Sequence, residues 1–99
     1  MSVEAQVDTS SRQVTISIEG AFGFNLVQEF RRCYTEKKDY RFVIDLRKVD
    51  YIDSAGLGML LNMHSYLDQD DGMIKITNTL PQVRKILTIS RFDKKFYIE

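Results

Sequence analysis

Residues 50–58 read DYIDSAGLG, in which an acid, a hydroxyl and two glycines stand between a strand-like hydrophobic segment and a strongly helical one. A glycine inside a helix costs about 1 kcal/mol relative to alanine, so Gly56 and Gly58 weaken the start of a segment that otherwise favours helix. The rest of the sequence follows local propensity well. Departures from local rules concentrate at functional sites, so this stretch is the first candidate for one.

The residues on the N-terminal side of this stretch predict a β-hairpin followed by a helix. Residues 3–8 and 13–18 alternate apolar and polar side chains, which is the period of half-buried strands, and the DTSSR segment between them is typical of a turn. After GAFGF, residues 25–39 carry apolar side chains at helical spacing, with Asn25 as the expected N-cap. We therefore expect two paired strands and a first amphipathic helix of about three turns.

The other segments predict strands that alternate with helices. Residues 41–46 (RFVIDL) are rich in β-branched and aromatic side chains and predict a central strand. Residues 54–69 place apolar side chains on one helical face, and residues 73–77 (MIKIT) predict the next strand. A third helix is expected over residues 80–89, and residues 96–98 are expected to close the chain as a short edge strand.

The order of these elements is β-β-α-β-α-β-α-(β), within a single domain that spans residues 1–99. A chain of 99 residues, 43% of them hydrophobic, has the size of one domain with one core. Strands that alternate with helices require crossover connections, and the starting hairpin adds an antiparallel pair. We therefore expect an α/β fold, with a mixed β-sheet of four to five strands flanked by three to four helices.

The overall charge and the single cysteine exclude several classes of protein. Fourteen Lys and Arg residues balance fourteen Asp and Glu residues, so the basic surface of a protein that binds nucleic acid or an anionic membrane is missing. Cys33 is the only cysteine, which excludes an internal disulfide and a cysteine-based metal cluster and fits a reducing compartment. The sequence shows neither a signal peptide nor an apolar run of about 20 residues. We expect a soluble cytoplasmic protein with no metal or other cofactor.

Residue types typical of catalytic sites are sparse. His64 is the only histidine and lies on the apolar side of its predicted helix, which indicates a structural role. Ser54 and His64 are separated by about 15 Å of helical rise, so the two side chains cannot form a triad. The segments 20–23 and 55–58 are rich in glycine but lack the Lys-Ser/Thr ending of a phosphate-binding loop. We expect a protein that is not an enzyme.

One stretch in the middle of the chain combines several specific features. A strand ends in Asp45-Leu46, a short loop follows, and IDSAGLG (52–58) opens a helix that continues with Leu60 and Leu61. This stretch resembles the STAS domain family, and more narrowly the single-domain bacterial anti-sigma factor antagonists. The order of the elements resembles that of the family over nearly the whole chain. The resemblance implies a protein-binding regulator of transcription that acts in signal transduction, rather than an enzyme. We expect a monomer, as small domains with a charged surface often are.

The resemblance also implies a switch based on phosphorylation, and by its position in the motif Ser54 is the phosphorylated residue. The unphosphorylated chain would bind an anti-sigma factor that is also a serine kinase of the GHKL type. The chain phosphorylated on Ser54 would release that partner. A PP2C-type serine phosphatase would then remove the phosphate and return the chain to its binding form. Family members often carry Gly-x-hydrophobic-Asp after the second strand, whereas residues 20–23 here read GAFG, which leaves the identity of the partner open. The alternative is a constitutive STAS subunit of a transport or regulatory complex.

The chemistry of the DYIDSAGLG stretch leaves two interpretations for most of its residues. Ser54 can accept a hydrogen bond as the N-cap of the helix, and a phosphate there would meet free N–H groups and the positive end of the helix dipole. Asp53 either orients that hydroxyl or the partner kinase, or simply forms the turn. Gly56 and Gly58 either expose backbone to a partner or allow the helix to pack closely against the sheet.

Side chains further along the helix and in the loop before the first helix extend this candidate surface. Met59, Asn62 and Tyr66 share a helical face and predict either an exposed contact patch or partial burial against a neighbouring helix. Phe22 and Phe24 either extend that patch or fill the core, where we expect at least one of them. The expected partner-binding residues are Phe22, Gly23, Asp53, Ser54, Ala55, Gly56, Gly58, Met59 and Asn62.

Overall fold

Five strands form one mixed sheet in the computed structural model, which describes residues 2–99. The strands lie in the order of the sequence, and only the first pair is antiparallel. The strands are β1 (Val3–Asp8), β2 (Gln13–Phe22), β3 (Arg41–Ile52), β4 (Ile74–Thr77) and β5 (Tyr97–Ile98). The α-helices are α1 (Val27–Arg32), α2 (Ser54–Leu67) and α3 (Pro81–Ile89), and two 3₁₀ turns are η1 (Phe24–Leu26) and η2 (Phe92–Lys94).

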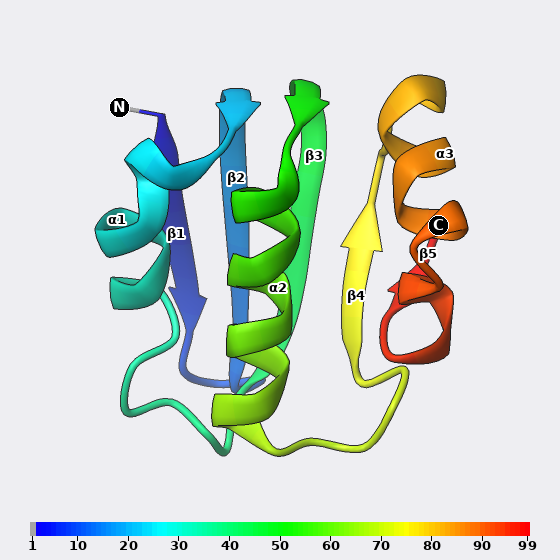
Figure 1. Cartoon of the computed structure of the whole chain (residues 1–99). Coiled ribbons are helices and arrows are strands. Elements are labelled where there is room, and N and C mark those ends of the chain that lie inside the picture. Colours follow the sequence, from blue (N-terminus) through cyan, green and yellow to red (C-terminus); the bar gives the residue numbers. More distant parts are fainter. Residues whose placement is uncertain (1) are drawn as a thin grey trace.

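The α-helices cover one face of this sheet. In Figure 1, α1 and α2 lie in front of β1, β2 and β3, and α3 lies toward the end of the sheet that holds β4 and β5. Each parallel connection leads to the next strand in the same direction, and crossovers are right-handed, so every connecting helix falls on the same face. None of the helices within residues 2–99 is long and apolar enough to cross a membrane; the longest, α2, has 14 residues.

The alternating strand pattern places apolar side chains under the helices. Val14 and Ile16 of β2 are fully buried, whereas Thr15 between them lies on the opposite, open face. Phe22 and Phe30 extend the core toward α1, with their ring centroids 5.2 Å apart. The predicted α/β class, the starting hairpin and the closing edge strand are confirmed.

The first helix differs from the prediction at both ends. The chain enters it through η1, where the Leu26 N–H donates to the Gly23 carbonyl at 3.0 Å, and Leu26 is the N-cap of α1 without a side-chain cap. The prediction that Asn25 caps the helix is wrong, because Asn25 lies inside the 3₁₀ turn. The helix also ends earlier than predicted, since residues 33–40 form separate hydrogen-bonded turns in which Glu36 has a left-handed backbone (φ 62°).

The central strand is longer than predicted, and this extension positions the candidate site. β3 runs for 12 residues rather than over 41–46, and β2 matches it with ten. The register between the two strands shifts after Ser17 and again after Gly20, whose φ of 92° suits glycine. These irregularities are β-bulges, and they allow pairing to continue past the polar RKVD segment. As a result, Phe22 and Ile52 pair side by side at the ends of their strands.

Candidate functional site

Helix α2 begins directly after β3, and its first turn is capped by Asp53. The Asp53 backbone is extended (φ −107°, ψ −175°), and its Oδ1 atom accepts a 2.9 Å hydrogen bond from the Gly56 N–H. The Asp53 carbonyl accepts the first intrahelical bond, from the Leu57 N–H at 3.0 Å. These features define an N-cap residue, so the prediction that Ser54 is the cap is wrong. Ser54 is instead the first residue of the helix.

Ser54 exposes its side chain at this helix end. It lies in the first turn, at the positive end of the helix dipole. The lone histidine has a structural position instead, since the His64 ring packs on Phe96 with 5.5 Å between centroids. Its Nε2 atom lies 3.2 Å from Asp71 Oδ1 but makes no hydrogen bond. The Ser54 hydroxyl is thus open to another protein rather than set in a histidine-based catalytic arrangement.

Gly56 allows the end of β2 to lie against the start of α2. A Cβ atom at position 56 would lie 2.2 Å from the Phe22 carbonyl oxygen and 2.8 Å from Cγ1 of Ile52. The same Phe22 carbonyl accepts a long hydrogen bond, 3.5 Å, from the Asp53 N–H. Backbone approach this close is open only to glycine. Of the two interpretations of Gly56, close packing is therefore the correct one.

The other two glycines of the predicted site have different surroundings. A Cβ atom at position 58 would meet nothing within 4 Å, so the backbone at Gly58 faces open space. A Cβ atom at position 23 would lie 2.9 Å from the Asp53 Oδ2 atom. The fold thus brings Gly23, Asp53 and Gly56 together from two segments that are far apart in the sequence.

Burial divides the predicted partner-binding residues into two groups. The exposed or half-buried members are Asp53, Ser54, Ala55, Gly58 and Asn62, and the buried members are Phe22, Gly23, Gly56 and Met59. The prediction of an exposed methionine is wrong: Met59 is 5% exposed, because it lies one turn from Gly56 and Met63 on the side of α2 that packs on the core. Phe22 fills the core, as expected for at least one of the two phenylalanines, whereas Phe24 is 76% exposed.

Two large apolar side chains are exposed on the segments that meet at the start of α2 or continue from it. They are Phe24 in η1, which follows the Gly23 that lies against Asp53, and Leu61 on α2, and together with Ser54 we call them the Ser54 surface. Tyr51 is also exposed, but it precedes the buried Ile52 and by strand alternation points to the opposite, helix-free face of the sheet. The predicted site lacks Leu61, which helical spacing could have found, because it lies two turns from Ser54 on the same face.

Tyr66, the third member of the patch predicted with Met59 and Asn62, is engaged within the molecule. Its hydroxyl accepts a 2.9 Å hydrogen bond from the Glu36 N–H. Its ring packs on Tyr34, with 5.5 Å between centroids, and the Lys38 ammonium lies 5.0 Å from the ring centroid. Tyr66 nevertheless remains 37% exposed, as the contact-patch interpretation expects, while its hydroxyl and ring anchor the connection between α1 and β3.

Both the sequence and the fold match known proteins. The family model of the STAS domain matches residues 4–99. The chain belongs to the STAS domain family. A STAS-domain containing protein of Pseudomonas aeruginosa is 38% identical over 100 residues, which cover 99% of each chain. BtrV of Bordetella bronchiseptica, whose name proposes an anti-sigma factor antagonist, is 39% identical over 57 residues, 58% of this chain and 49% of BtrV.

Solved structures of an anti-sigma factor antagonist have the same fold as this STAS domain. SpoIIAA in its unphosphorylated form matches with a TM-score of 0.72 and 15% identity, over 98% of this chain and 86% of SpoIIAA. The phosphorylated form of SpoIIAA, a Bacillus cell fate determinant, matches with a TM-score of 0.70 and 15% identity, over 98% of this chain and 90% of SpoIIAA. This STAS domain therefore has the fold of the anti-sigma factor antagonists.

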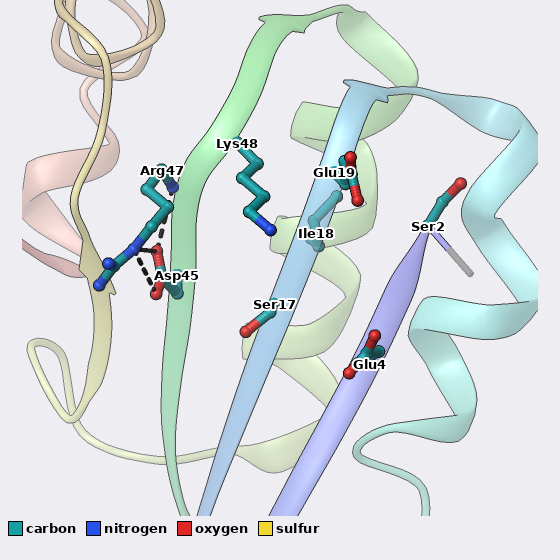
Figure 2. A pocket seen from close by; sticks show the side chains of 8 residues that line it. All are labelled: Ser2, Glu4, Ser17, Ile18, Glu19, Asp45, Arg47 and Lys48. Atoms are coloured by element: carbon teal, nitrogen blue, oxygen red, sulfur yellow. Dashed lines mark hydrogen bonds and ion pairs between the residues drawn. The ribbon is translucent and has the colours of Figure 1, made fainter.

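The helix-free face of this STAS domain carries a shallow cavity of about 310 Å³. Figure 2 shows its side chains on the sheet face turned away from α1 and α2. Glu4, Ser17 and Asp45 form one row across three paired strands, with Arg47 and Lys48 beside them. Both signs of charge are present there, and Arg47 Nε lies 3.1 Å from Asp45 Oδ2.

Asp45, within β3, connects this strand to the residue that follows β4. Its carboxylate accepts hydrogen bonds from the Arg47 N–H at 3.0 Å, from the Arg47 guanidinium and from the Asn78 side-chain amide at 3.3 Å. Burial is the largest single influence and raises the pKa of Asp45. The hydrogen bonds from Arg47 and Asn78 together outweigh burial, so the pKa of Asp45 is below its usual value.

Replacing Asp45 with asparagine is expected to remove part of the acid sensitivity of this STAS domain. A pKa that is lower in the folded chain contributes stability above the unfolded-state value of about 3.9, and that stability is lost as the pH falls through the folded-state pKa. Urea denaturation from about pH 6 downward measures this. The urea concentration at the unfolding midpoint should fall more steeply below about pH 4 for the native chain than for Asp45→Asn. If the midpoints of both chains fell in parallel with pH, the role of this carboxylate would be contradicted.

The cysteine of this STAS domain is inert in its surroundings. Cys33 is buried, and its thiol donates a weak 3.4 Å hydrogen bond to the Glu29 carbonyl. Burial raises the pKa of the thiol; the neighbouring Lys37 lowers it and the Glu29 charge raises it to a lesser extent. Within residues 2–99, no three His, Cys, Asp or Glu side chains are grouped to hold a metal ion.

Proposed function

We propose that this STAS domain is an anti-sigma factor antagonist controlled by phosphorylation of Ser54. The unphosphorylated chain binds an anti-sigma factor that is also a serine kinase, and the phosphorylated chain releases it. The observation that carries the proposal is the exposed Ser54 side chain at the N-terminus of α2, in a STAS domain with the fold of SpoIIAA. Both SpoIIAA forms, unphosphorylated and phosphorylated, match this fold, which supports a switch that leaves the backbone intact.

The position of Ser54 is suited to a phosphate. A phosphoserine carries about −1.5 to −2 charges and three acceptor oxygens, and the first turn of a helix offers N–H donors and the positive end of its dipole. Asp53 already occupies one of these donors, the Gly56 N–H, and brings a second negative charge to the same place. The folded chain can therefore hold the phosphate, whereas a partner that packs there must remove two neighbouring negative charges from water.

The partner that fits this cycle is a GHKL-type serine kinase with anti-sigma activity. It transfers the γ-phosphoryl group of ATP to the Ser54 hydroxyl oxygen, which forms a P–O bond as the bond to ADP breaks and the hydroxyl proton leaves. A PP2C-type phosphatase hydrolyses the phosphoserine to serine and inorganic phosphate. The chain itself supplies the acceptor hydroxyl and the binding surface, in which Phe24 and Leu61 offer apolar contact beside Ser54.

Ser54→Ala is expected to retain partner binding and to lose phosphorylation completely. The hydroxyl is the acceptor atom, but Asp53 rather than Ser54 caps the helix, so removal of the hydroxyl leaves α2 intact. Mass spectrometry of the chain isolated from its own cells, before and after deletion of the candidate kinase or phosphatase, measures the phosphate. We expect Ser54 phosphate to disappear without the kinase and to accumulate without the phosphatase.

Ser65→Ala is the matched control, because Ser65 is another exposed serine on α2. It should carry the same level of Ser54 phosphate as the native chain. A native chain without phosphate at Ser54 under every condition would contradict the switch. That result would favour a constitutive subunit of a larger complex.

A further inference from the structure

Gly23 is a glycine for a reason other than backbone conformation. Its φ of −142° and ψ of −169° are extended values that any residue adopts. The residue is nevertheless buried, and the three atoms nearest to a Cβ at this position all belong to the Asp53 carboxyl group. They are Oδ2 at 2.9 Å, and Cγ and Oδ1 at 3.4 Å each. The missing side chain of Gly23 is therefore the space that the Asp53 carboxylate occupies.

The Asp53 carboxylate is held on two sides. One oxygen, Oδ1, accepts the capping bond from the Gly56 N–H at 2.9 Å, and the other, Oδ2, lies against Gly23. The Asp53 N–H also donates to the Phe22 carbonyl at 3.5 Å, which holds the backbone of the cap against the end of β2. A methyl group at position 23 would have to push the carboxylate aside, because the carboxylate is the movable end of a side chain, and we expect that shift to loosen the capping bond.

We propose that Gly23 is a positioning residue for Ser54. By leaving room for the Asp53 carboxylate, Gly23 fixes the first turn of α2. The first turn in turn fixes the direction in which the Ser54 hydroxyl points from the helix. The role in phosphoryl transfer rests on the proposed function, in which Ser54 is the acceptor. A displacement of about 1 Å in the position of a reacting group can slow a reaction by about a hundredfold, so a loosened first turn should slow phosphorylation.

Hydrogen exchange of the Gly56 amide, followed by NMR on purified chains, tests the positioning directly. Gly23→Ala should raise the exchange rate of this amide about fivefold, the effect expected for a lost N-cap bond, and Asp53→Ala should do the same. Gly58→Ala adds an equivalent methyl group where nothing lies within 4 Å and should not raise the rate. An unchanged rate in Gly23→Ala would overturn the proposal.

A second-site substitution identifies the clash as the cause. Serine is a good N-cap but is smaller than aspartate, so Asp53→Ser combined with Gly23→Ala should restore slow exchange at Gly56. Exchange in the double variant that stays as fast as in Gly23→Ala would overturn the steric explanation. Thermal unfolding of each variant verifies that the chains compared are folded.

The rate of Ser54 phosphorylation in the cells of origin tests the consequence for the switch. We expect the initial rate to fall about tenfold or more in Gly23→Ala and to remain at the native value in Ser65→Ala. A phosphorylated native chain together with an unchanged rate in Gly23→Ala would overturn the role of Gly23 while sparing the proposed function. A native chain that is never phosphorylated would overturn the proposed function, and the Gly56 amide would still report whether Gly23 positions the cap.

Discussion

Gly56→Ala is expected to destabilise the folded chain by about 2 kcal/mol. Adding a methyl group to a packed site costs about 1–3 kcal/mol, and the upper end applies here because the nearest atom is a backbone oxygen, Phe22 O at 2.2 Å, which cannot rotate aside. The helix propensity of alanine returns about 1 kcal/mol of this loss. The clash is expected to prevail, because β2 or α2 must shift to relieve it.

Thermal unfolding of Gly56→Ala and Gly58→Ala measures this effect with a built-in comparison. A change of 1 kcal/mol moves the Tm of a domain of this size by about 4–8 °C, so Gly56→Ala should lower the Tm by about 10 °C. Gly58→Ala meets no atom within 4 Å and should raise it by several degrees through helix propensity alone. Two shifts of the same sign would show that the close approach at Gly56 does not control stability.

The strand pattern could be predicted because the helices cover only one face of the sheet. Buried and exposed residues then alternate, as in Val14, Thr15 and Ile16, and a single sequence displays that period. The end of α1 could not be predicted in this way. The Glu36 N–H, in the turns that follow α1, donates to the Tyr66 hydroxyl, a contact between residues far apart in the sequence that local propensity does not contain.

The candidate site could be predicted as a segment, but the roles of its residues could not. Asp53 and Ser54 are both good N-caps, and which of them caps α2 depends on where β3 ends. Gly56 and Gly58 look alike in the sequence. They differ in the structure because the Phe22 carbonyl, at the end of β2, approaches only Gly56.

Phosphorylation of Ser54 is expected to weaken binding of the partner kinase by about a hundredfold or more. The partner would have to bury a phosphate of about −1.5 to −2 charges directly beside the Asp53 carboxylate, and like charges at an interface cost several kcal/mol. Since 1.4 kcal/mol corresponds to a factor of ten in affinity, such a penalty removes two or more orders of magnitude. The free chain should keep its stability within about 1 kcal/mol, because the helix N-terminus favours the anion.

Calorimetric titration of the partner kinase with the native chain, and with a chain that carries genetically encoded phosphoserine at position 54, measures the change. Ser54→Asp should fall between the two, because a carboxylate carries one charge and fewer acceptor oxygens. Ser65→Asp adds the same charge further along α2, about 16 Å from Ser54 by the helical rise, and should bind within a few-fold of the native chain. Equal affinities for the phosphorylated and unphosphorylated chains would mean that the charge at Ser54 does not control binding. If Ser65→Asp lost as much affinity as Ser54→Asp, the contact surface would instead run the length of α2. The electrostatic repulsion would then be spread along the helix rather than concentrated at its first turn.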